Sequence, residues 1–517
     1  MKKQLRTLTA GVAVLMLGTI LAACGNENPP KAGESKSTEG AKSAQPLKEV
    51  TLKIFLPGDD KPAKAEVLQA LYEKTKDKLN AKFEINFVPF GDYQNKMTLL
   101  ASSGDNYDAA FTADWFGFAN MVNKGAFLDV TELAQKYAPN LYKTYKDNNF
   151  LADASVNGKM YALPWTEIKT SKPIFKYRKD IADKLNVKPG DLSTLEGIDA
   201  FLTEIAKANP GMTPFDQQIG GPGLMGNILA FELAKYELQN FGFHDLVMDL
   251  NDPAHKLVPV EQTQAFKEAV KLAKKWYDAG IIDKNAISEK NVQLYENSKA
   301  FSVRGLGGEM FEKTNFTDKS AVLGAAEPYA DKKFTRDSQI NNAIAINKNA
   351  ANPERMLMFI ELLSTDKSVY DLFMYGIKDK TYSVDDKGVI GFAKGEDPAK
   401  PQWQNWSSWG FWRTNLYSET VSRPLSAVKQ TQAFSQRPNI VLSPIAGFVP
   451  SPDAIKTELA QRDQIESEQG RLLLAGVVKG DVDQAVSDYI AKQKTVGLDK
   501  VLAETQKQVD EFLKNKK

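Results

Sequence analysis

The sequence has few of the residues on which disulfides, metal sites and most catalytic centres depend. Its 517 residues include one cysteine, Cys24, and two histidines, His244 and His255. A single cysteine allows no disulfide within the chain and no thiolate metal site, so a packed core has to stabilise the fold. Charge of one sign is also lacking, because 66 lysines and arginines balance 65 acidic residues. A body this close to neutral argues against nucleic acid as a partner.

An apolar run covers residues 8–20 and is too short to span a membrane as a helix. Basic residues precede it within the first six positions, and Leu-Ala-Ala-Cys follows at residues 21–24. This pattern predicts a signal peptide over residues 1–23. The tetrapeptide resembles the lipobox of bacterial lipoproteins, which implies a diacylglyceryl group on Cys24. An ordinary secreted protein whose signal ends in cysteine is the alternative.

From Cys24 to residue 45 the chain consists mainly of Asn, Pro, Lys, Gly, Glu, Ser and Thr. Such a composition buries too little apolar surface to fold, so residues 24–45 are predicted to be a flexible tether. A lipid anchor with several acyl chains is durable. We therefore expect a body on the extracellular face of the cell membrane, held there by its lipid anchor alone.

The folded part opens with alternating strand and helix patterns. Residues 50–56 are β-branched and apolar, residues 64–79 are amphipathic, and residues 83–90 and 107–112 again have strand character. This order predicts an α/β sheet. Because ligands of such sheets gather at the carboxyl ends of strands, the residues just beyond those ends are candidates for ligand binding. They are Asp59, Asp60, Asp114 and Trp115.

Several short segments along the chain form a series of motifs in a fixed order. They are Gly-Ala-Phe-Leu-Asp-Val at 125–130, Asn-Gly-Lys-Met-Tyr-Ala-Leu-Pro at 157–164, Ile-Ala-Ile-Asn at 344–347 and Asn-Pro-Glu-Arg at 352–355. In this order they resemble the carbohydrate-type, family-one extracellular solute-binding proteins of ABC importers. The tail, residues 447–513, is similar to the helical C-terminal region of the large lipoprotein branch of that family.

The resemblance implies an α/β fold of the two-lobed, periplasmic-binding-protein-like (type II) class, with hinge-crossing strands and a helical C-terminal region. It also implies a monomer that traps an oligosaccharide by lobe closure and delivers it to the permease subunits of an ABC importer. No cofactor is implied, and no D-x-D-x-D-G loop predicts a metal. The lobes and crossings are expected as follows: lobe 1 at 46–168 plus 345–444, lobe 2 at 169–344 plus 445–517, and crossings near 168–173, 341–345 and 444–448.

Local helix signals agree with this expectation. Residues 193–196 (Ser-Thr-Leu-Glu) fit a capping box, and Pro353 and Pro452 suit first helical turns. Helical periodicity covers residues 261–279 and 453–474.

Tryptophans are expected at a sugar-binding surface, because an indole ring stacks on the C–H face of a pyranose while Asp, Glu or Arg binds its hydroxyls. Residues 401–412 hold four of the seven tryptophans among Asn, Gln, Ser and Gly. Of these we take Trp406, Trp409 and Trp412 as ligand-binding candidates. Their spacing of three fits equally well the buried side of a helix.

The remaining candidates flank the expected crossings. Trp165 follows Leu-Pro at the approach to the first crossing, and Glu167 lies beside it. Arg304 ends an expected strand before four residues rich in glycine, 305–308, and Phe448 lies near the last crossing. The ordinary alternatives are an ion pair for Glu167 and a simple turn for the glycines.

Enzymatic motifs are weak. A literal G-x-G-x-x-G at residues 221–226 follows no buried strand and contains Pro222, so we reject a dinucleotide site. His244 and His255 lie in one loop region without metal-ligand spacing, and no G-x-S-x-G serine is present. A glycosidase needs only two carboxylates, and no pair is marked by its sequence.

The sequence thus predicts a binding protein rather than an enzyme. Two alternatives stay open: an extracellular glycan-degrading enzyme, and a receptor that presents its ligand to a membrane sensor. The charge balance disfavours a strongly anionic polymer such as polygalacturonate, although one arginine can still bind one uronate. Peptides are a weaker alternative, since their termini call for paired charges.

Overall fold

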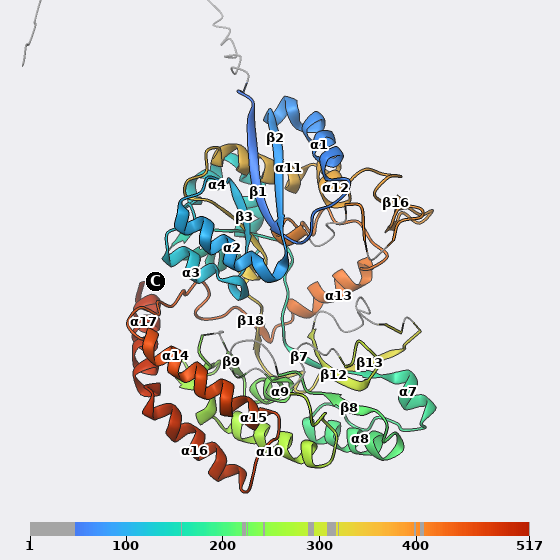
Figure 1. The fold of residues 1–517 in the computed structure, drawn as a ribbon, viewed down its shortest axis with the longest axis vertical. Coiled ribbons are helices and arrows are strands. Elements are labelled where there is room, and N and C mark those ends of the chain that lie inside the picture. The colour runs from blue at the N-terminus through green and yellow to red at the C-terminus, as the bar shows by residue number, and fades with distance from the viewer. Residues whose placement is uncertain are drawn as a thin grey trace, which may run out of the picture. The chain divides into compact units, whose positions relative to one another are not determined.

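The computed structural model describes residues 47–515 except 157, 220–223, 225, 241–242, 288–293, 308–316, 319, 398–399 and 404–407. The lipidation candidate Cys24 and the ligand candidate Trp406 therefore lie outside the described residues. Two sheets, each with its own helices and hydrophobic core, organise the described chain (Figure 1). We call them the first and the second lobe.

The sheet of the first lobe has the strand order β2-β1-β3-β15-β6. Its strands are β1 (Val50–Pro57), β2 (Ala81–Val88), β3 (Ala109–Thr112), β6 (Leu163–Pro164) and β15 (Ala343–Ile346). β2, β1 and β3 run parallel, whereas β15 is antiparallel to both β3 and β6. The strand–helix–strand start predicted from residues 50–112 is confirmed, and the helix at 64–79 has the expected bounds.

The first lobe also contains helices and short elements outside this sheet. They are α1 (Lys64–Leu79), α2 (Phe90–Ser103), η1 (Asp114–Phe116), α3 (Phe118–Asn123), α4 (Thr131–Tyr137), α5 (Pro139–Asp147), α6 (Leu151–Ala154), β4 (Ser155–Val156), β5 (Lys159–Met160), η4 (Gln339–Asn341), α11 (Pro353–Thr365), α12 (Lys367–Tyr375), β16 (Ser383–Val384), β17 (Ile390–Gly391), η5 (Ser408–Gly410) and α13 (Leu425–Ser435). The core that they enclose draws on residues from Leu52 to Trp165 and from Ile340 to Val428. Pro353 is the first residue of α11, as predicted.

The sheet of the second lobe has the order β13-β7-β12-β8, and a smaller sheet has the order β11-β10-β9. The elements of this lobe are β7 (Pro173–Arg178), α7 (Lys179–Lys184), α8 (Leu195–Ala208), β8 (Thr213–Asp216), α9 (Asn227–Lys235), β9 (Leu238–Asn240), β10 (Leu246–Asp249), β11 (Leu257–Pro259), η2 (Val260–Gln262), α10 (Gln264–Asp278), β12 (Ala300–Leu306) and β13 (Leu323–Ala326). The predicted capping box requires Ser193 as the N-cap of α8. The N-cap is instead Thr194, whose hydroxyl accepts from the Gly197 N–H at 3.3 Å, so α8 begins one residue later than predicted.

The C-terminal region is helical, as predicted, and packs on the second lobe (Figure 1). It contains α14 (Lys456–Ile465), a π-helical turn η6 (Glu466–Gly470), α15 (Arg471–Leu474), α16 (Val482–Thr495) and α17 (Leu498–Asn515). The expectation for Pro452 is wrong: α14 begins at Lys456, and the Pro452 carbonyl instead closes a turn with the Ile455 N–H. None of the described helices is both long and apolar enough to cross a bilayer.

A group of buried charges joins this C-terminal region to the second lobe. Arg462 Nη2 lies 3.4 Å from Glu261 Oε1, and both side chains are buried. Glu466 is also buried and shares a hydrogen bond with Asp245. Burial, followed by that hydrogen bond and the charge of Asp245, raises the pKa of Glu466 to about 10. Glu466 therefore holds a proton at neutral pH.

Three segments that run between the lobes lie side by side. Thr170 Oγ1 donates to the Thr335 carbonyl at 2.9 Å, and Asp337 accepts from the N–H and hydroxyl of Ser171. The third segment joins through β14 (Phe334–Thr335) and β18 (Ile440–Val441), which pair in parallel. The precise lobe boundaries expected from the sequence remain a prediction.

A fully buried lysine stabilises this junction. Lys172 Nζ donates to the carbonyls of Ala330 and Lys332 and lies 3.2 Å from Glu327 Oε1. Burial lowers the pKa of Lys172, and Glu327 works against that shift. Glu327 also pairs with Arg437, which follows α13. The end of α13 is thereby tied to the second lobe, while Val428 on the same helix belongs to the core of the first.

Candidate functional site

Three aromatic side chains form a partly exposed surface at the end of the first sheet. They are Phe90 at the start of α2, Trp115 in η1 and Trp409 in η5, and we call them the aromatic platform. Phe90 is 50% exposed and Trp115 46% exposed, which is unusual for rings of this size. The Phe90 ring stacks on Trp115 at 6.1 Å and lies 5.8 Å from Trp409. These are separations at which aromatic pairs attract each other.

The platform rests on a second, more buried layer of rings. Phe111 on β3 contacts Trp409 at 5.1 Å and Trp115 at 5.9 Å, and Phe116 contacts Phe90 at 5.4 Å. Trp115 is fixed at its polar edge as well, because its Nε1 donates to the Asn341 carbonyl at 2.7 Å. Asn341 ends η4, which directly precedes β15, so Trp115 is tied to the segment that leads into the first sheet.

Trp409 reaches the platform through an uncommon backbone. Its φ of 39° and ψ of 61° are left-handed, a conformation that costs a bulky residue energy. The next residue, Gly410, has φ +98°, and a Cβ there would lie 2.7 Å from the Ala343 carbonyl carbon in β15. A glycine is therefore required where this loop crosses the sheet. The alternative that Trp406, Trp409 and Trp412 line one side of a helix is wrong for the two of them that the structure describes.

A buried arginine holds the same loop from below. Arg413 is fully buried, and its Nη1 donates to the carbonyls of Gly410 and Trp412 at 3.1 and 2.9 Å. Its Nε donates to the Ser364 hydroxyl of α11 at 2.9 Å. Burial lowers the pKa of the Arg413 guanidinium. Arg413 thus acts on the platform only through the backbone that carries Trp409.

Two tryptophans and their cations form a neighbouring cluster. Lys169 Nζ lies 5.1 Å above the Trp165 ring, and the Arg423 guanidinium lies 4.9 Å above the Trp412 ring. Glu167, which is fully buried, pairs with Arg423 at 2.5 Å and lies 3.7 Å from Lys169. Trp165 and Trp412 are themselves nearly buried. Binding of a ligand by Glu167 would require its ion pair with Arg423 to open.

Backbone hydrogen bonds hold this cluster together. The Thr166 N–H donates to the Trp412 carbonyl at 3.1 Å, and Thr414 Oγ1 donates to the Thr166 carbonyl at 2.9 Å. The start of the first crossing therefore runs beside residues 412–414. Trp412 Nε1 is buried and has no hydrogen-bond partner among the described residues.

The second lobe contributes Arg304 near the carboxyl end of β12. The side chain is half-buried, and its Nε donates to Asn227 Oδ1 at 3.1 Å. Three residues later Gly307 donates its N–H to the Lys172 carbonyl at 2.9 Å, and a Cβ on Gly307 would collide with the Phe434 ring of α13. This end of the strand therefore meets the first crossing and α13. The glycines thus serve close packing at Gly307.

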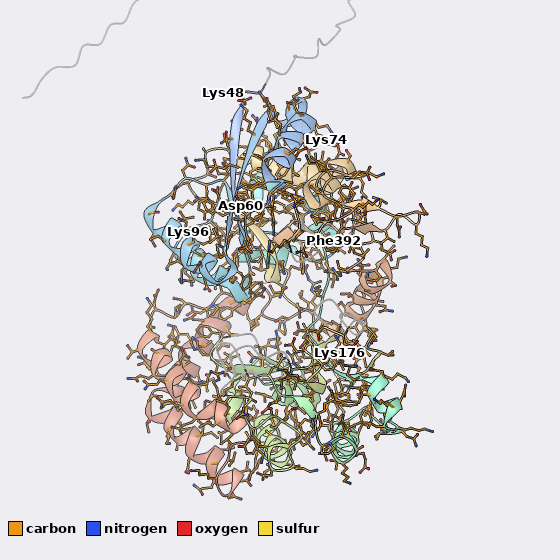
Figure 2. The ribbon with its side chains drawn as sticks, turned by 45° about the vertical axis from the view of Figure 1, so that its right-hand side comes forward. Lys48, Asp60, Lys74, Lys96, Lys176 and Phe392 are labelled. Carbon is orange, nitrogen blue, oxygen red and sulfur yellow. The ribbon has the colours of Figure 1, made fainter. Side chains whose placement is uncertain are left out.

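The other sequence candidates are not among the rings of the platform. Asp59 is exposed, and its neighbour Asp60 (Figure 2) pairs with Lys64 at 2.5 Å. Asp114 is exposed and accepts from the Trp115 N–H at 2.7 Å. Phe448 is half-buried and packs its ring 5.6 Å from Phe512 of α17. The assignment of all these side chains to ligand binding stays a prediction.

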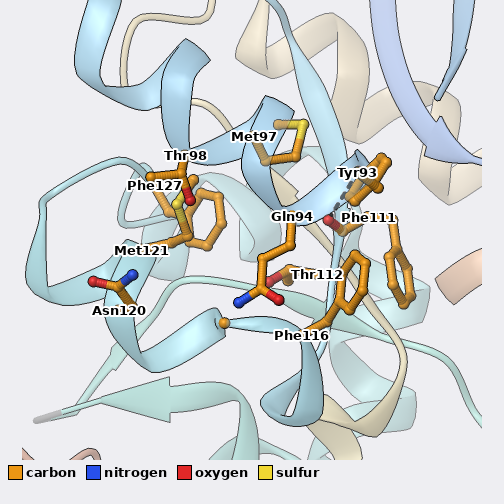
Figure 3. A pocket seen from close by; sticks show the side chains of 11 residues that line it. Tyr93, Gln94, Met97, Thr98, Phe111, Thr112, Phe116, Asn120, Met121 and Phe127 are labelled. Atoms are coloured by element: carbon orange, nitrogen blue, oxygen red, sulfur yellow. Dashed lines mark hydrogen bonds between the residues drawn. The ribbon is translucent and has the colours of Figure 1, made fainter. Parts of the chain in front are cut away.

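A small pocket of about 10 Å³ lies beneath the platform and has room for one water molecule. Phe111 and Phe116 line it on the platform side, and Gln94 lies at the centre of the lining residues (Figure 3). Gln94 fits there because Gly117, with φ +85°, has no Cβ; one would lie 3.0 Å from Gln94 Nε2. The pocket is too small for a sugar.

Sequence reasoning missed Phe90, Arg413 and Arg423. The strand pattern at residues 83–90 placed Phe90 inside a strand, whereas β2 ends at Val88 and Phe90 begins α2. Pro89 between them was the available signal, because proline favours the start of a helix. No local pattern distinguishes Arg413 or Arg423, since their contacts come from distant parts of the chain.

Among the described residues, no group of three or more His, Cys, Asp or Glu side chains is placed to hold a metal ion. The arrangement offers aromatic faces, directed N–H donors and a few cations. That combination suits the binding of a polar molecule with apolar faces.

Comparison with known proteins agrees with this geometry. Residues 69–378 match the family model described as bacterial extracellular solute-binding protein, and residues 444–514 match a domain of unknown function (DUF3502). The chain is 27% identical over 527 residues to a carbohydrate ABC transporter substrate-binding protein of Streptococcus pneumoniae serotype 4 (strain ATCC BAA-334 / TIGR4), covering 100% of both chains. It is 25% identical over 438 residues to the polygalacturonan/rhamnogalacturonan-binding protein YtcQ of Bacillus subtilis (strain 168), covering 81% of this chain and 78% of that protein.

Solved structures confirm the fold class. The crystal structure of the N-glycan transport solute binding protein (NgtS) from Streptococcus pneumoniae matches with a TM-score of 0.75 at 23% identity, covering 91% of this chain and 100% of that one. The two-lobed α/β fold expected from the sequence is therefore correct. Since the family model spans more than half of the sequence, the chain belongs to the bacterial extracellular solute-binding proteins.

Proposed function

We propose that this protein captures an extracellular oligosaccharide between its two lobes and delivers it intact to an ABC importer. The observation that carries the proposal is the aromatic platform of Phe90, Trp115 and Trp409. Large rings that stay half exposed in a folded protein need a reason, and a sugar ring stacked on them supplies one. The names of the relatives, which concern carbohydrates, support the same class of ligand.

The site extends from the platform toward the crossings. Trp165 and Trp412 with their cations lie beside the first crossing, and Arg304 lies where β12 meets that crossing and α13. A ligand that contacts the platform and Arg304 at once would hold the two lobes together. Such differential contact is what makes lobe closure depend on ligand.

The proposal includes the location. The basic start, apolar run and Leu-Ala-Ala-Cys at 21–24 support lipidation of Cys24, and the polar composition of residues 24–45 supports a tether. Replacing Cys24 by Ser should release the protein into the medium or leave it uncleaved. Membrane retention of Cys24→Ser with a mature N-terminus would contradict the anchor.

The proposal is tested by melting the purified full-length protein with neutral oligosaccharides, acidic oligosaccharides, monosaccharides and peptides. Specific binding stabilises the native state by mass action and so raises the melting temperature. At a ligand concentration of 100 times Kd, the free energy of unfolding increases by about 2.7 kcal/mol. Each mixture is then analysed for shortened products. A rise with one class of oligosaccharide and full recovery of the sugar is expected.

Other outcomes separate the alternatives. Shortened sugar would mean a glycan-degrading enzyme. A rise with peptides alone would overturn the carbohydrate proposal. If the sugar binds but its uptake by cells does not depend on the protein, presentation to a membrane sensor is the better account.

A further inference from the structure

Arg304 is a cation that has no ion-pair partner among the described residues. Its only hydrogen bond is from Nε to the neutral Asn227 Oδ1, at 3.1 Å, and neither Nη1 nor Nη2 has a partner among the described residues. Burial lowers the pKa of this guanidinium, and no carboxylate counteracts the shift. The two terminal nitrogens of the guanidinium therefore have no acceptor among the described residues.

Three buried cations of the second lobe differ from Arg304 in this respect. Lys172 lies 3.2 Å from Glu327, Arg178 lies 2.6 Å from Asp180, and Arg462 lies 3.4 Å from Glu261. Pairing with a carboxylate is how folded proteins compensate the cost of removing a charge from water. The absence of such a partner at Arg304 is therefore a feature of this position and not of the lobe.

The amino end of α9 adds positive potential at the same place. Asn227, which holds Arg304, is the first residue of this nine-residue helix, and the N-cap is Gly226, which has no side chain to cap it. No acidic residue lies in the first turn of α9. Aligned peptide dipoles make such an end attractive to anions.

The nearest strand carries a carboxylate that is engaged elsewhere. Asp216 ends β8, which pairs with β12. Its Oδ2 accepts from the Tyr295 N–H at 3.2 Å and from Gln218 Nε2 at 3.0 Å, while its backbone carbonyl accepts from Asn227 Nδ2 at 2.7 Å. Asn227 is thus fixed from both sides, which fixes the guanidinium that it holds.

From this arrangement we propose that the ligand is an acidic oligosaccharide and that Arg304, at the amino end of α9, binds one of its carboxylates. The inference rests on the proposed function and narrows its ligand to sugars that contain a uronate or a similar acid. A planar carboxylate matches the two free N–H groups of a guanidinium, forming two parallel charge-assisted hydrogen bonds. A neutral hydroxyl would accept from only one of these N–H groups, and the charge of the guanidinium would stay uncompensated.

The near-zero net charge of the chain does not conflict with this inference. One carboxylate needs one cation, whereas a receptor for the whole surface of a polyanion would need many. The platform provides the apolar part of the site, so a single acidic unit among stacked sugar rings is the ligand that fits best.

The test uses the purified full-length protein and three matched trisaccharides: α-1,4-linked trigalacturonate, its methyl ester and galactotriose of the same linkage. Parallel sets built on mannuronate and glucuronate extend the comparison. We expect one acidic trisaccharide to bind at least 10-fold more tightly than its ester, and its affinity to fall as NaCl rises from 0.05 to 0.5 M. Arg304→Gln should weaken that binding about 30-fold or more and leave binding of the ester unchanged.

Arg178→Gln is the matched control, because Arg178 lies on the adjacent strand β7 and is paired with Asp180 and Asp318. This control should lower the melting temperature and keep the affinity. Arg304→Gln should behave in the opposite way, since it removes a charge that the described protein does not compensate. A large loss of melting temperature in Arg304→Gln without a change in affinity would overturn the inference.

The failure of the inference differs from the failure of the proposed function. Binding of a neutral oligosaccharide, with acidic ones inactive and Arg304→Gln without effect, would overturn the acidic ligand and leave the oligosaccharide receptor intact. Binding of peptides and of no sugar would overturn both.

Discussion

The clearest prediction concerns the proton that Glu466 holds beside Asp245, where the C-terminal helices meet the second lobe. Glu466 is buried, and its pKa is raised from 4.5 to about 10 by burial and by the hydrogen bond to Asp245. An acid with a raised native pKa stabilises the fold fully only below its unfolded pKa. As the pH rises above 4.5, the unfolded chain releases a proton that the native chain must keep, so stability is lost up to about pH 10.

The size of this effect follows from the pH interval. Each pH unit between the two pKa values costs 1.36 kcal/mol, so about 2.5 units between 4.5 and 7 give an upper bound of about 3 kcal/mol at neutral pH. Glu466→Gln replaces the protonated carboxyl with a neutral donor of the same shape. We therefore expect the variant to gain up to about 3 kcal/mol over the wild type at pH 7, and little at pH 5.

The assay is the melting temperature of both proteins between pH 5 and 9. The difference between them should widen with pH, to a few degrees at pH 8 for a chain of this size. Glu468→Gln is the matched control, since Glu468 is exposed on the same π-helical turn and should give a curve parallel to the wild type. Parallel curves for Glu466→Gln would refute the raised pKa of Glu466.

Three further predictions concern the site. Trp115→Ala should weaken ligand binding by about 1 to 3 kcal/mol in a titration, because it removes a platform ring; unchanged affinity would exclude the platform as a contact. Gly410→Ala should lower the free energy of unfolding by about 2 kcal/mol more than Gly388→Ala in denaturant melts, since both have positive φ but a Cβ only at Gly410 meets backbone; equal losses would contradict this clash. Glu167→Gln should destabilise the fold by about 2 to 4 kcal/mol by leaving Arg423 without its carboxylate; a double-mutant cycle with Arg423→Gln should show the coupling, and additive losses would refute it.

The candidate site was only partly accessible to sequence reasoning. Trp115 was found because it follows a strand whose carboxyl end the pattern located, and the same rule led to Asp59 and Asp114. Trp409 was selected from a stretch rich in tryptophan, but its partner Phe90 was not, since the ring stack joins residues more than 300 positions apart. Glu167 illustrates a different limit. Its ion pair with Arg423 spans 256 residues, and no local pattern announces it.

Local chemistry is what the sequence by itself determined. The periodicities of residues 50–112 predicted the first strands and helix, Pro353 predicted the start of α11, and the motif series predicted the family and the two-lobed fold. These properties depend on neighbours a few residues apart, or on patterns shared by a whole family.

The tertiary structure decided which side chains are free and which are paired. Trp403 and Trp409 are six residues apart, yet one is fully buried beneath α12 and the other joins the platform, because Gly410 and Arg413 turn the loop onto β15. Arg304 and Arg178 both lie on strands of the second sheet, yet one lacks the carboxylate that the other has. The ion pairing and the exposure of these side chains are set by contacts between segments distant in the sequence. Those contacts form only when the chain folds, so no local pattern predicts them.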